Sequence, residues 1–492
     1  MKKLCIILLI VTCHSSLVTS FAQVNPPLRI ELESAKDQQD YKFVPLGEQG
    51  VAIFYQSAII NVDTAQWVFI LYDTNLVRTN LYKLKIPNLC KFMAADYSND
   101  KLYLFLQKPA HKKDTIRNYL LEWNIISEDF QLFDLQNYKH PFVSSIKVAE
   151  DNLFIVVHDQ KAMAIIYYNY KTNTKQAIQF TEDEIVSIES FCIDKRLKRT
   201  GFCMFLKNKQ GTRAEFFVTD YSGKIIYRDH LPYYPEVIFN SCKISLVGND
   251  SLLVTGGYSH IKDKKVKGSY SGIYTFLFVK NRFTEINLYP FGALLTSETG
   301  LNLKQFSDPN LTMNAHTLQS NGRTFVITEL FIPEYQYTST SYNPYRSYRY
   351  YGYDPPTQVF AGFRYMSAYI LAFDTQGILL NDWVFPINNV LTQSIYNLVG
   401  LYQDEQENTL MYYVNQKEIT SQFLNGKQVL AAQASVPVEL LNRTDVLEYS
   451  SNLSMRSWYN NIFLLSGYQY IKNSQRGKGK RYVFFINKLV CE

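Results

Sequence analysis

The sequence lacks the short signatures by which many enzymes and metal proteins are recognised. It has no Cys-x-x-Cys pair, no His-Glu-x-x-His, no G-x-S-x-G nucleophile elbow, no phosphate loop and no dinucleotide fingerprint. Beyond the N-terminal segment it also lacks any run approaching the ~20 apolar residues that a membrane-spanning helix needs. We therefore name no catalytic residue, and we expect no cofactor, no metal site and no transmembrane segment.

Glycine (21) and proline (16) are moderate, whereas tyrosine (38) and phenylalanine (32) are abundant, which favours strands over helices. Charged residues make up only 19% of the chain and apolar residues 47%, a composition that excludes a disordered protein. The sequence therefore predicts a globular, all-β body.

A polar tight turn followed by an apolar, β-forming run recurs along the chain, and the first five copies are spaced about 50 residues apart, in the range of repeat architectures. Hairpin turns between these copies add further strands, so each period contains four. We predict a single β-propeller of eight four-stranded blades, with seven blades as the alternative. The predicted blades are 41–85, 90–135, 143–180, 184–229, 237–289, 312–385, 395–435 and 445–490.

The last predicted blade lacks a fourth strand before the chain ends, and Leu28 to Glu33 form an unassigned strand near the N-terminus. A closed array needs both of its edges paired. We therefore predict that residues 28–33 pair with the strand at 481–489 and close the ring.

The first 22 residues have the order of a secretory signal peptide: Lys2 and Lys3, a short apolar run, and small residues ahead of Gln23. The predicted mature chain, 23–492, is exported to the periplasm or secreted. A loose lipobox ending at Cys13 leaves lipid anchoring as an alternative.

Five cysteines remain after this cleavage. Cys192 and Cys203 stand nearly symmetrically about a polar turn, which predicts a disulfide across a hairpin in an oxidising compartment. The alternative is two small core residues, because spacing alone does not establish disulfide geometry. The pairing of Cys90, Cys242 and Cys491 stays open.

The loops between the second and third strands (B–C loops) are rich in cations, whereas the turns between the first and second strands (A–B turns) carry acids such as Glu48, Asp151 and Glu407. This distribution predicts one basic face that attracts anionic partners. The alternative is that solvated loops are simply charged. The B–C cations are Lys108, Lys112, Lys113, Arg117, Lys207, Lys209, Arg213, Lys262, Lys264, Lys265, Lys267, Arg346, Arg349, Lys472, Arg476, Lys478, Lys480 and Arg481.

An outsized tyrosine-rich loop is predicted at 334–365 in blade six. Tyrosine with interspersed arginine is typical of recognition loops, because these side chains supply contact area at low entropic cost. A flexible low-complexity insert is the alternative. The predicted partner-binding residues here are Tyr342, Tyr345, Arg346, Tyr348, Arg349, Tyr350, Tyr351 and Tyr353, with Lys262, Lys264, Lys265 and Lys267 in blade five.

Resemblance to known families is generic. The segment from Leu252 to Tyr258, with its Gly-Gly pair, resembles the double-glycine strand end of a kelch repeat, and the cleavage region and Lys/Asn/Tyr-rich composition resemble exported propeller proteins of Bacteroidota. The Gly-His and Trp-Asp pairs of WD repeats and the Asp-boxes of sialidases are missing. No specific family follows from these residues.

The sequence favours a non-catalytic exported protein that binds an anionic glycan or an envelope protein through a basic, tyrosine-rich loop face. The alternative is a polysaccharide-active propeller enzyme, a hydrolase or lyase, since propeller enzymes assemble their sites from several blades and leave no linear motif. Nucleic-acid binding is disfavoured by export. The oligomeric state cannot be read from the sequence.

Overall fold

The computed structural model describes most of the chain. The described residues are 28–34, 40–109, 116–135, 143–158, 163–179, 185–208, 211–231, 234–247, 251–262, 265–266, 270–279, 282–283, 286–291, 311–320, 322–337, 358–426, 428–442, 444–473 and 480–490. These residues are almost entirely β-structure; the short 3-10 helix η1 (Gly47–Gln49) lies in the first hairpin.

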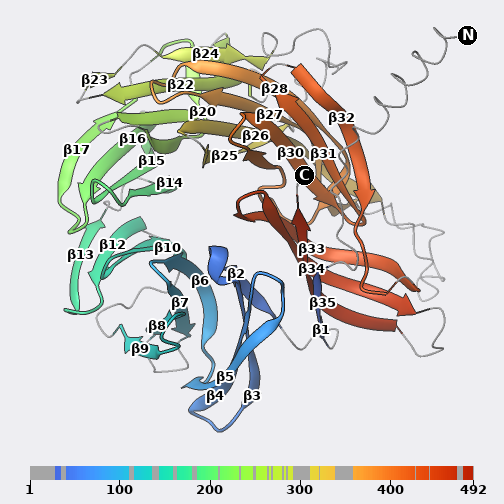
Figure 1. The fold of residues 1–492 in the computed structure, drawn as a ribbon. Helices are drawn as coiled ribbons and strands as arrows, with labels where there is room; N and C mark the ends of the chain where they lie inside the picture. Colours follow the sequence, from blue (N-terminus) through green and yellow to red (C-terminus); the bar gives the residue numbers. More distant parts are fainter. Residues whose placement is uncertain are drawn as a thin grey trace, which may run out of the picture. The chain divides into compact units, whose positions relative to one another are not determined.

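The described strands form eight antiparallel sheets, and in six of them neighbouring strands follow one another along the chain. This arrangement confirms the predicted β-propeller with eight blades, and the alternative of seven is wrong. The first four blades are β2 (Lys42–Pro45), β3 (Val51–Ile59), β4 (Thr64–Tyr72) and β5 (Arg78–Pro87); β6 (Lys91–Ser98), β7 (Lys101–Lys108), β8 (Arg117–Asn124) and β9 (Phe130–Asp134); β10 (Val143–Ala149), β11 (Asn152–His158), β12 (Met163–Asn169) and β13 (Thr174–Gln179); and β14 (Ile185–Asp194), β15 (Arg199–Asn208), β16 (Gly211–Asp220) and β17 (Ile225–His230) (Figure 1).

Blade five departs from the simple pattern because its first and last strands are each broken in two. Its strands are β18 (Val237–Phe239), β19 (Lys243–Val247), β20 (Ser251–Lys262), β21 (Lys265–Val266), β22 (Gly272–Val279), β23 (Arg282–Phe283) and β24 (Asn287–Pro290). The later blades are β25 (Thr312–Ser320), β26 (Arg323–Tyr337), β27 (Gln358–Phe373) and β28 (Leu379–Thr392); β29 (Gly400–Gln403), β30 (Asn408–Asn415), β31 (Glu418–Asn425) and β32 (Gln428–Pro437); and β33 (Asp445–Tyr459), β34 (Ile462–Asn473) and β35 (Lys480–Val490).

The chain divides into two compact units. One comprises Met1–Leu231 with Tyr402–Glu492, and the other comprises Pro232–Leu401. Blades five and six lie in the second unit and blades one to four and eight in the first, with β29 of blade seven crossing the boundary.

The polar turns that mark the repeat have a physical role in the hairpins. Asn99, Asp100, Glu150, Glu407 and Asn460 all have positive φ between 48° and 67°. Asparagine and aspartate tolerate this left-handed conformation better than most side chains. The sequence pattern therefore located the A–B turns through the backbone geometry that such turns require.

The N-terminal strand β1 (Arg29–Glu33) completes blade eight, as predicted. It pairs antiparallel with β35, with Arg29 opposite Asn487 and Glu33 opposite Val483. Figure 1 shows β1 in blue beside β35 in red. The last blade thus acquires its fourth strand from the other end of the chain, and the edge of β35 is paired.

Consecutive blades of the first unit pack through large apolar side chains. Phe54 and Phe69 of blade one meet Trp123 and Phe130 of blade two in one buried cluster. The ring centroids of Phe69 and Trp123 lie 5.8 Å apart in an edge-on arrangement. Each fully buried side chain of this size stabilises the fold by about 1.5–3 kcal/mol. Such side chains come from both faces of the inner strands, which explains their continuous apolar runs.

The predicted disulfide between Cys192 and Cys203 is wrong in this structure. The hairpin turn pairs Asp194 with Arg199, and with this register Cys192 lies opposite Gly201 and Cys203 lies opposite Ser190, two residues further along the ladder. Cys192 carries a thiol, whereas Cys203 is buried and disulfide-bonded. The two sulfurs therefore do not face each other across the hairpin. Cys242, in the second unit, is also disulfide-bonded, and Cys90 is a buried thiol.

Candidate partner-binding surface

Most of the predicted binding residues lie outside the described residues. These are Tyr342, Tyr345, Arg346, Tyr348, Arg349, Tyr350, Tyr351 and Tyr353, together with Lys264 and Lys267. The backbones of Lys262 and Lys265 are described, and the two residues face each other where β20 pairs with β21. The structure therefore places part of the lysine run on a tight hairpin of blade five.

The tyrosine-rich loop is shorter than predicted, because β26 and β27 extend far into it. β26 continues to Tyr337 and β27 begins at Gln358, so residues 334–337 and 358–365 are strand and not loop. Tyr335 is opposite Phe360, and Tyr337 is opposite Gln358. We call this two-stranded extension, residues 334–337 with 358–363, the blade-six ribbon.

The ribbon exposes large apolar side chains. Tyr335 is 49% exposed, Tyr337 69%, Val359 47% and Phe360 39%. Side chains alternate between the two faces of a strand, so Tyr335 and Tyr337 lie on the same face. Exposed aromatic and aliphatic side chains gathered at one place mark interaction sites more often than isolated ones do.

A series of ring contacts anchors this exposed end to the core of blade six. Tyr335 contacts Phe360, Phe360 contacts Phe363, and Phe363 contacts Phe331, with centroid separations of 5.7, 5.0 and 5.5 Å. Phe331 then lies 5.3 Å from the ring of Tyr365. Since Phe331 and Tyr365 are fully buried, the exposed rings stand on a packed base.

Gly362 makes the bend at which the ribbon leaves the sheet. Its φ is +146°, and a Cβ at this position would lie 2.5 Å from the carbonyl oxygen of Thr392. The pairing of β26 with β27 also shifts by one residue between Glu334 and Tyr335. A β-bulge with glycine re-aims the strand end. The side chains of Glu334 and Arg364 form an ion pair across the strands at this point.

Beneath the ribbon, Tyr365 and Glu329 fasten the connection that leaves blade six. The Tyr365 hydroxyl donates to the carbonyl oxygen of Tyr396 at 2.7 Å, so this tyrosine of the predicted loop is a buried anchor. The Glu329 carboxyl accepts hydrogen bonds from the backbone N–H groups of Leu398 and Val399 at 2.7 and 2.6 Å. Sequence reasoning missed Glu329, because nothing local distinguishes it from other strand residues.

Two titratable groups at this anchor have strongly shifted pKa values. Burial raises the pKa of Glu329 to about 7, although the hydrogen bonds from Val399, Leu398 and Asn314 oppose the shift. Burial lowers the pKa of His316 to about 4. Within the described part of the chain, the His316 Nδ1 has no hydrogen-bond partner. Glu329 itself is 0% exposed, so it is positioned to hold the backbone and not to touch a substrate.

A second candidate surface lies on blade eight, in the first unit. Lys472 and Lys480 are exposed at the two ends of the loop between β34 and β35. The Lys480 ammonium lies 5.4 Å from the ring centroid of Tyr470, and the Tyr449 ring lies 5.4 Å from that of Tyr470. Lys480 also pairs with the carboxylate of Glu448 at 3.5 Å, so this exposed cation has an aromatic ring and an acid as neighbours.

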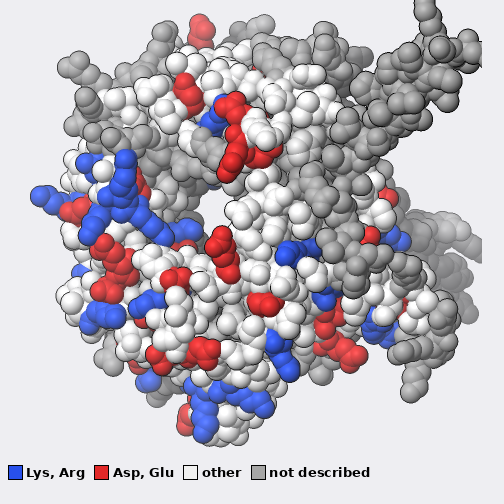
Figure 2. Space-filling model, in the orientation of Figure 1, with Lys and Arg blue, Asp and Glu red and all other residues white. Residues whose placement is uncertain are grey.

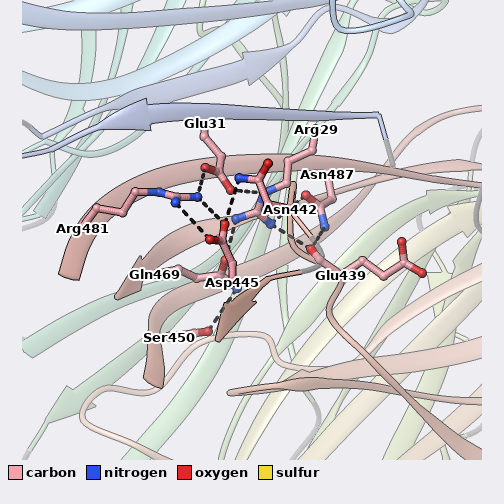
Figure 3. Close-up of polar contacts among 9 residues, drawn as sticks. All are labelled: Arg29, Glu31, Glu439, Asn442, Asp445, Ser450, Gln469, Arg481 and Asn487. Atoms are coloured by element: carbon pink, nitrogen blue, oxygen red, sulfur yellow. Dashed lines mark hydrogen bonds and ion pairs between the residues drawn. The ribbon is translucent and has the colours of Figure 1, made fainter. Parts of the chain in front are cut away.

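Arg481, another predicted B–C cation, forms ion pairs with two acids. Its guanidinium donates to Glu31 and Asp445, both at 2.7 Å. Arg29 continues this network by donating to Glu31, Gln469 and Asn487, and its guanidinium lies 4.3 Å from the Phe485 ring centroid. Figure 3 shows the alternating positive and negative groups joining β1 to β35 and to the connection before β33; the residues drawn are Arg29, Glu31, Glu439, Asn442, Asp445, Ser450, Gln469, Arg481 and Asn487.

The A–B turns are not purely acidic, in contrast to the predicted polarity. Lys198 pairs with Glu150 at 2.8 Å, and the Lys195 ammonium donates to Ser98 at 2.6 Å. Figure 2 shows basic and acidic side chains interspersed on the face that it presents. Charge therefore varies from blade to blade at these turns.

Among the described residues, no three His, Cys, Asp or Glu side chains gather closely enough to hold a metal ion. In the same part of the chain, no helix is long and apolar enough to cross a membrane.

No family model matches the chain, and no curated protein matches it. Among solved structures, it is similar to the β-propeller domain of the Trilobed protease from Pyrococcus furiosus, with 9% identity and a TM-score of 0.37 over 82% of this chain and 96% of that one. It is similar to the Dos1 propeller, with 10% identity and a TM-score of 0.39 over 82% and 92%. It is also similar to polysaccharide lyase Uly1, with 8% identity and a TM-score of 0.38 over 81% and 90%.

Proposed function

We propose that this chain is an exported, non-catalytic binding protein that recognises an anionic glycan or an envelope protein through the blade-six ribbon and the tyrosine-rich segment that it carries. The observation that supports this proposal is the ribbon's exposed aromatic end, which stands on a buried ladder of rings. Rigid, exposed aromatic side chains lose little entropy on binding and dominate the energetics of many interfaces.

Charge supplies the second part of the proposal. Lys472 and Lys480 on blade eight are exposed, and Lys480 lies beside the Tyr470 ring and 3.5 Å from the Glu448 carboxylate. Lys262 and Lys265 of the blade-five lysine run face each other where β20 pairs with β21. Cations of this kind mainly accelerate encounter with an anionic partner, whereas buried aromatic contacts slow its release. Binding should therefore weaken with salt without disappearing.

The buried carboxyl of Glu329 does not favour the alternative of a polysaccharide-active enzyme. Its pKa is raised to about 7, which suits a general acid, but a catalytic carboxyl must reach its substrate. Glu329 is 0% exposed and its oxygens are occupied by backbone N–H groups and Asn314. A role in positioning the blade-six connection explains these contacts.

The test is a hairpin replacement. Because Tyr337 and Gln358 are directly paired, an Asn-Gly turn in place of 338–357 closes the ribbon without the tyrosine-rich segment. A second variant combines Tyr335→Ser with Tyr337→Ser. A matched control combines Val429→Ser with Leu430→Ser, which are 51% and 49% exposed on β32 of another blade.

Each protein is assayed for binding to an array of acidic and neutral polysaccharides and, by cross-linking, to envelope proteins of its source. We expect the wild type and the control to bind one class of ligand and both ribbon variants to lose it, with unchanged melting temperatures. Equal binding by folded ribbon variants, or no binding by the wild type to either class, contradicts the proposal. Turnover of a polysaccharide by the wild type would support the enzyme instead.

A further inference from the structure

An exposed apolar cluster on blade one shares no residue with the ribbon or with the lysines of blade eight. The hairpin joining β3 to β4 continues past the end of β2, which pairs with β3 only as far as Phe54, and Ile59 is 63% exposed, Ile60 46% and Val62 86%. Leu89, on the connection from blade one to blade two, is 48% exposed. We call these four residues, Ile59, Ile60, Val62 and Leu89, the blade-one tip.

The tip has a defined backbone. The N–H groups of Ile60 and Asn61 both donate to the carbonyl oxygen of Thr64, at 3.0 and 3.1 Å, and the N–H of Asp63 donates to the Asn61 side chain at 2.9 Å. Aliphatic side chains are therefore held outward by a hydrogen-bonded turn. Ordinary hairpin turns prefer glycine and polar residues, so three exposed aliphatic residues here need an explanation.

Asn88 joins the two segments of the tip. Its side-chain amide is nearly buried and donates to the carbonyl oxygens of Asn61 and Val62 at 3.4 and 3.2 Å, while its own N–H donates to the carbonyl oxygen of Asp63 at 2.8 Å. The Asn88 side-chain oxygen accepts from the N–H of Leu89 at 2.8 Å. These hydrogen bonds join the β3–β4 turn and the segment that follows β5 into one surface.

Leu89 has a φ of +65°, which is an unusual conformation for a bulky residue. Such strain persists only where the surrounding contacts impose it, and it recurs at functional sites. Here it directs an apolar side chain into solvent next to the hairpin, where an asparagine or glycine would be better tolerated.

Cations surround the tip at this end of blades one and two. Lys85 lies near the end of β5, Lys91 begins β6, and Lys108 faces Arg117 where β7 pairs with β8. Lys85, Lys91 and Arg117 are exposed. Two exposed acids also lie at this end of the blades: Asp63 on the turn and Asp134 at the end of β9. The surface is thus apolar at its tip and basic at its margin.

We propose that the blade-one tip inserts into the interface of an anionic lipid membrane and holds the protein there as a peripheral protein. Aliphatic side chains that enter the acyl boundary, with lysine and arginine at headgroup level, are the two components of such binding. The proposal does not depend on the blade-six ribbon.

The test uses the purified full-length mature protein and sedimentation with vesicles of phosphatidylcholine alone or mixed with an equal amount of phosphatidylglycerol. We expect binding to the mixed vesicles that weakens with salt. Ile60→Ser with Val62→Ser should reduce the partition coefficient roughly tenfold or more, given the transfer free energy of each aliphatic side chain. Lys85→Ser with Lys91→Ser should remove part of the salt dependence. The control is Val429→Ser with Leu430→Ser, on blade seven, and it should bind as the wild type does.

Two further variants separate lipid contact from a structural role. Val62→Trp places a fluorophore at the most exposed position, and its emission should shift to the blue with mixed vesicles and not with phosphatidylcholine alone. Leu89→Asn should keep or raise the melting temperature while lowering vesicle binding.

Absence of vesicle binding by the wild type overturns the proposal, as does an equal loss in the tip and control variants. A wild-type dimer that the Ile60→Ser with Val62→Ser variant converts to a monomer in light scattering would assign the tip to a contact between copies, which also overturns it. Because the ribbon variants retain the tip, they should bind vesicles normally even if the proposed partner recognition fails.

Discussion

Removing the guanidinium of Arg29 tests how the N-terminal strand completes blade eight. The Arg29 side chain is 0% exposed and donates to Glu31 at 2.7 Å, to Gln469 at 2.6 Å, to Asn487 at 3.0 Å and to the carbonyl oxygen of Glu439 at 3.1 Å. Arg29→Met preserves most of the side-chain volume against Phe485 but leaves these acceptors without their donor.

Breaking a buried pair by deleting one partner costs about 3–5 kcal/mol, because the remaining polar groups stay buried. For a chain of this size ~1 kcal/mol shifts the melting temperature by about 1–2 °C, so Arg29→Met should lower it by roughly 3–10 °C. The melting temperature of Arg29→Lys should lie between those of the wild type and Arg29→Met, since an ammonium cannot reproduce the planar donor geometry of the guanidinium.

The assay is thermal unfolding followed by circular dichroism, with urea unfolding as a second measurement. Lys42→Met is the matched control, because Lys42 pairs with Asp40 at 2.8 Å on the surface. The Lys42 side chain is 36% exposed and that of Asp40 is 75% exposed. Exposed pairs contribute about 0–1 kcal/mol. If Arg29→Met is no more destabilising than Lys42→Met, the network of Figure 3 does not hold β1 in place.

Three further outcomes are expected. The pKa of Glu329 is raised from 4.5 to about 7 in the folded protein, so the stability that its protonated form contributes below pH 4.5 is lost as the pH rises to about 7. Glu329→Gln should therefore reduce the change in the free energy of urea unfolding across this pH window by about 3 kcal/mol. An unchanged pH dependence in the variant would contradict the shift. Gly362→Ala should destabilise blade six by about 1–3 kcal/mol, because Gly362 has a φ of +146° and an added Cβ would lie 2.5 Å from the Thr392 carbonyl oxygen. The control in urea unfolding is Gly426→Ala: Gly426 also has a positive φ, +53°, but an added Cβ there would meet no atom within 4 Å. The difference between the two variants separates the steric clash from the conformational strain. In peptide mapping of unfolded but unreduced protein, Cys192 should be alkylated directly and Cys203 only after reduction; a linked Cys192–Cys203 peptide would restore the original prediction.

The blades were predictable because their information is local. A left-handed turn at residues such as Asn99 or Glu407, followed by a continuous apolar run, is readable within ten residues. The pairing of Leu28–Glu33 with the last blade was also predictable, because the last blade lacked one strand and this segment was the strand without a blade.

The extent of each strand and the environment of single side chains were not predictable. The tyrosine-rich segment was expected to be loop from residue 334, yet pairing with β27 carries β26 to Tyr337. The expected disulfide fails because the hairpin turn pairs Asp194 with Arg199, which places Cys203 opposite Ser190 and not opposite Cys192. The two residues at which a turn closes set the register of the whole hairpin, and sequence spacing does not reveal which two they are.

The sequence by itself determined the order and the approximate limits of the blades, because turns and apolar runs act over short distances, whereas the structure decided between eight blades and seven. Only the tertiary structure decided which charges are neutralised and which apolar residues are exposed. Arg29 meets Gln469 and Asn487 across more than 400 residues, Glu329 is buried against the Leu398–Val399 backbone, and Ile60 and Val62 remain in solvent although they resemble core residues in type. Burial and partner choice depend on elements that meet only after folding, which is why a pattern along the chain cannot supply them.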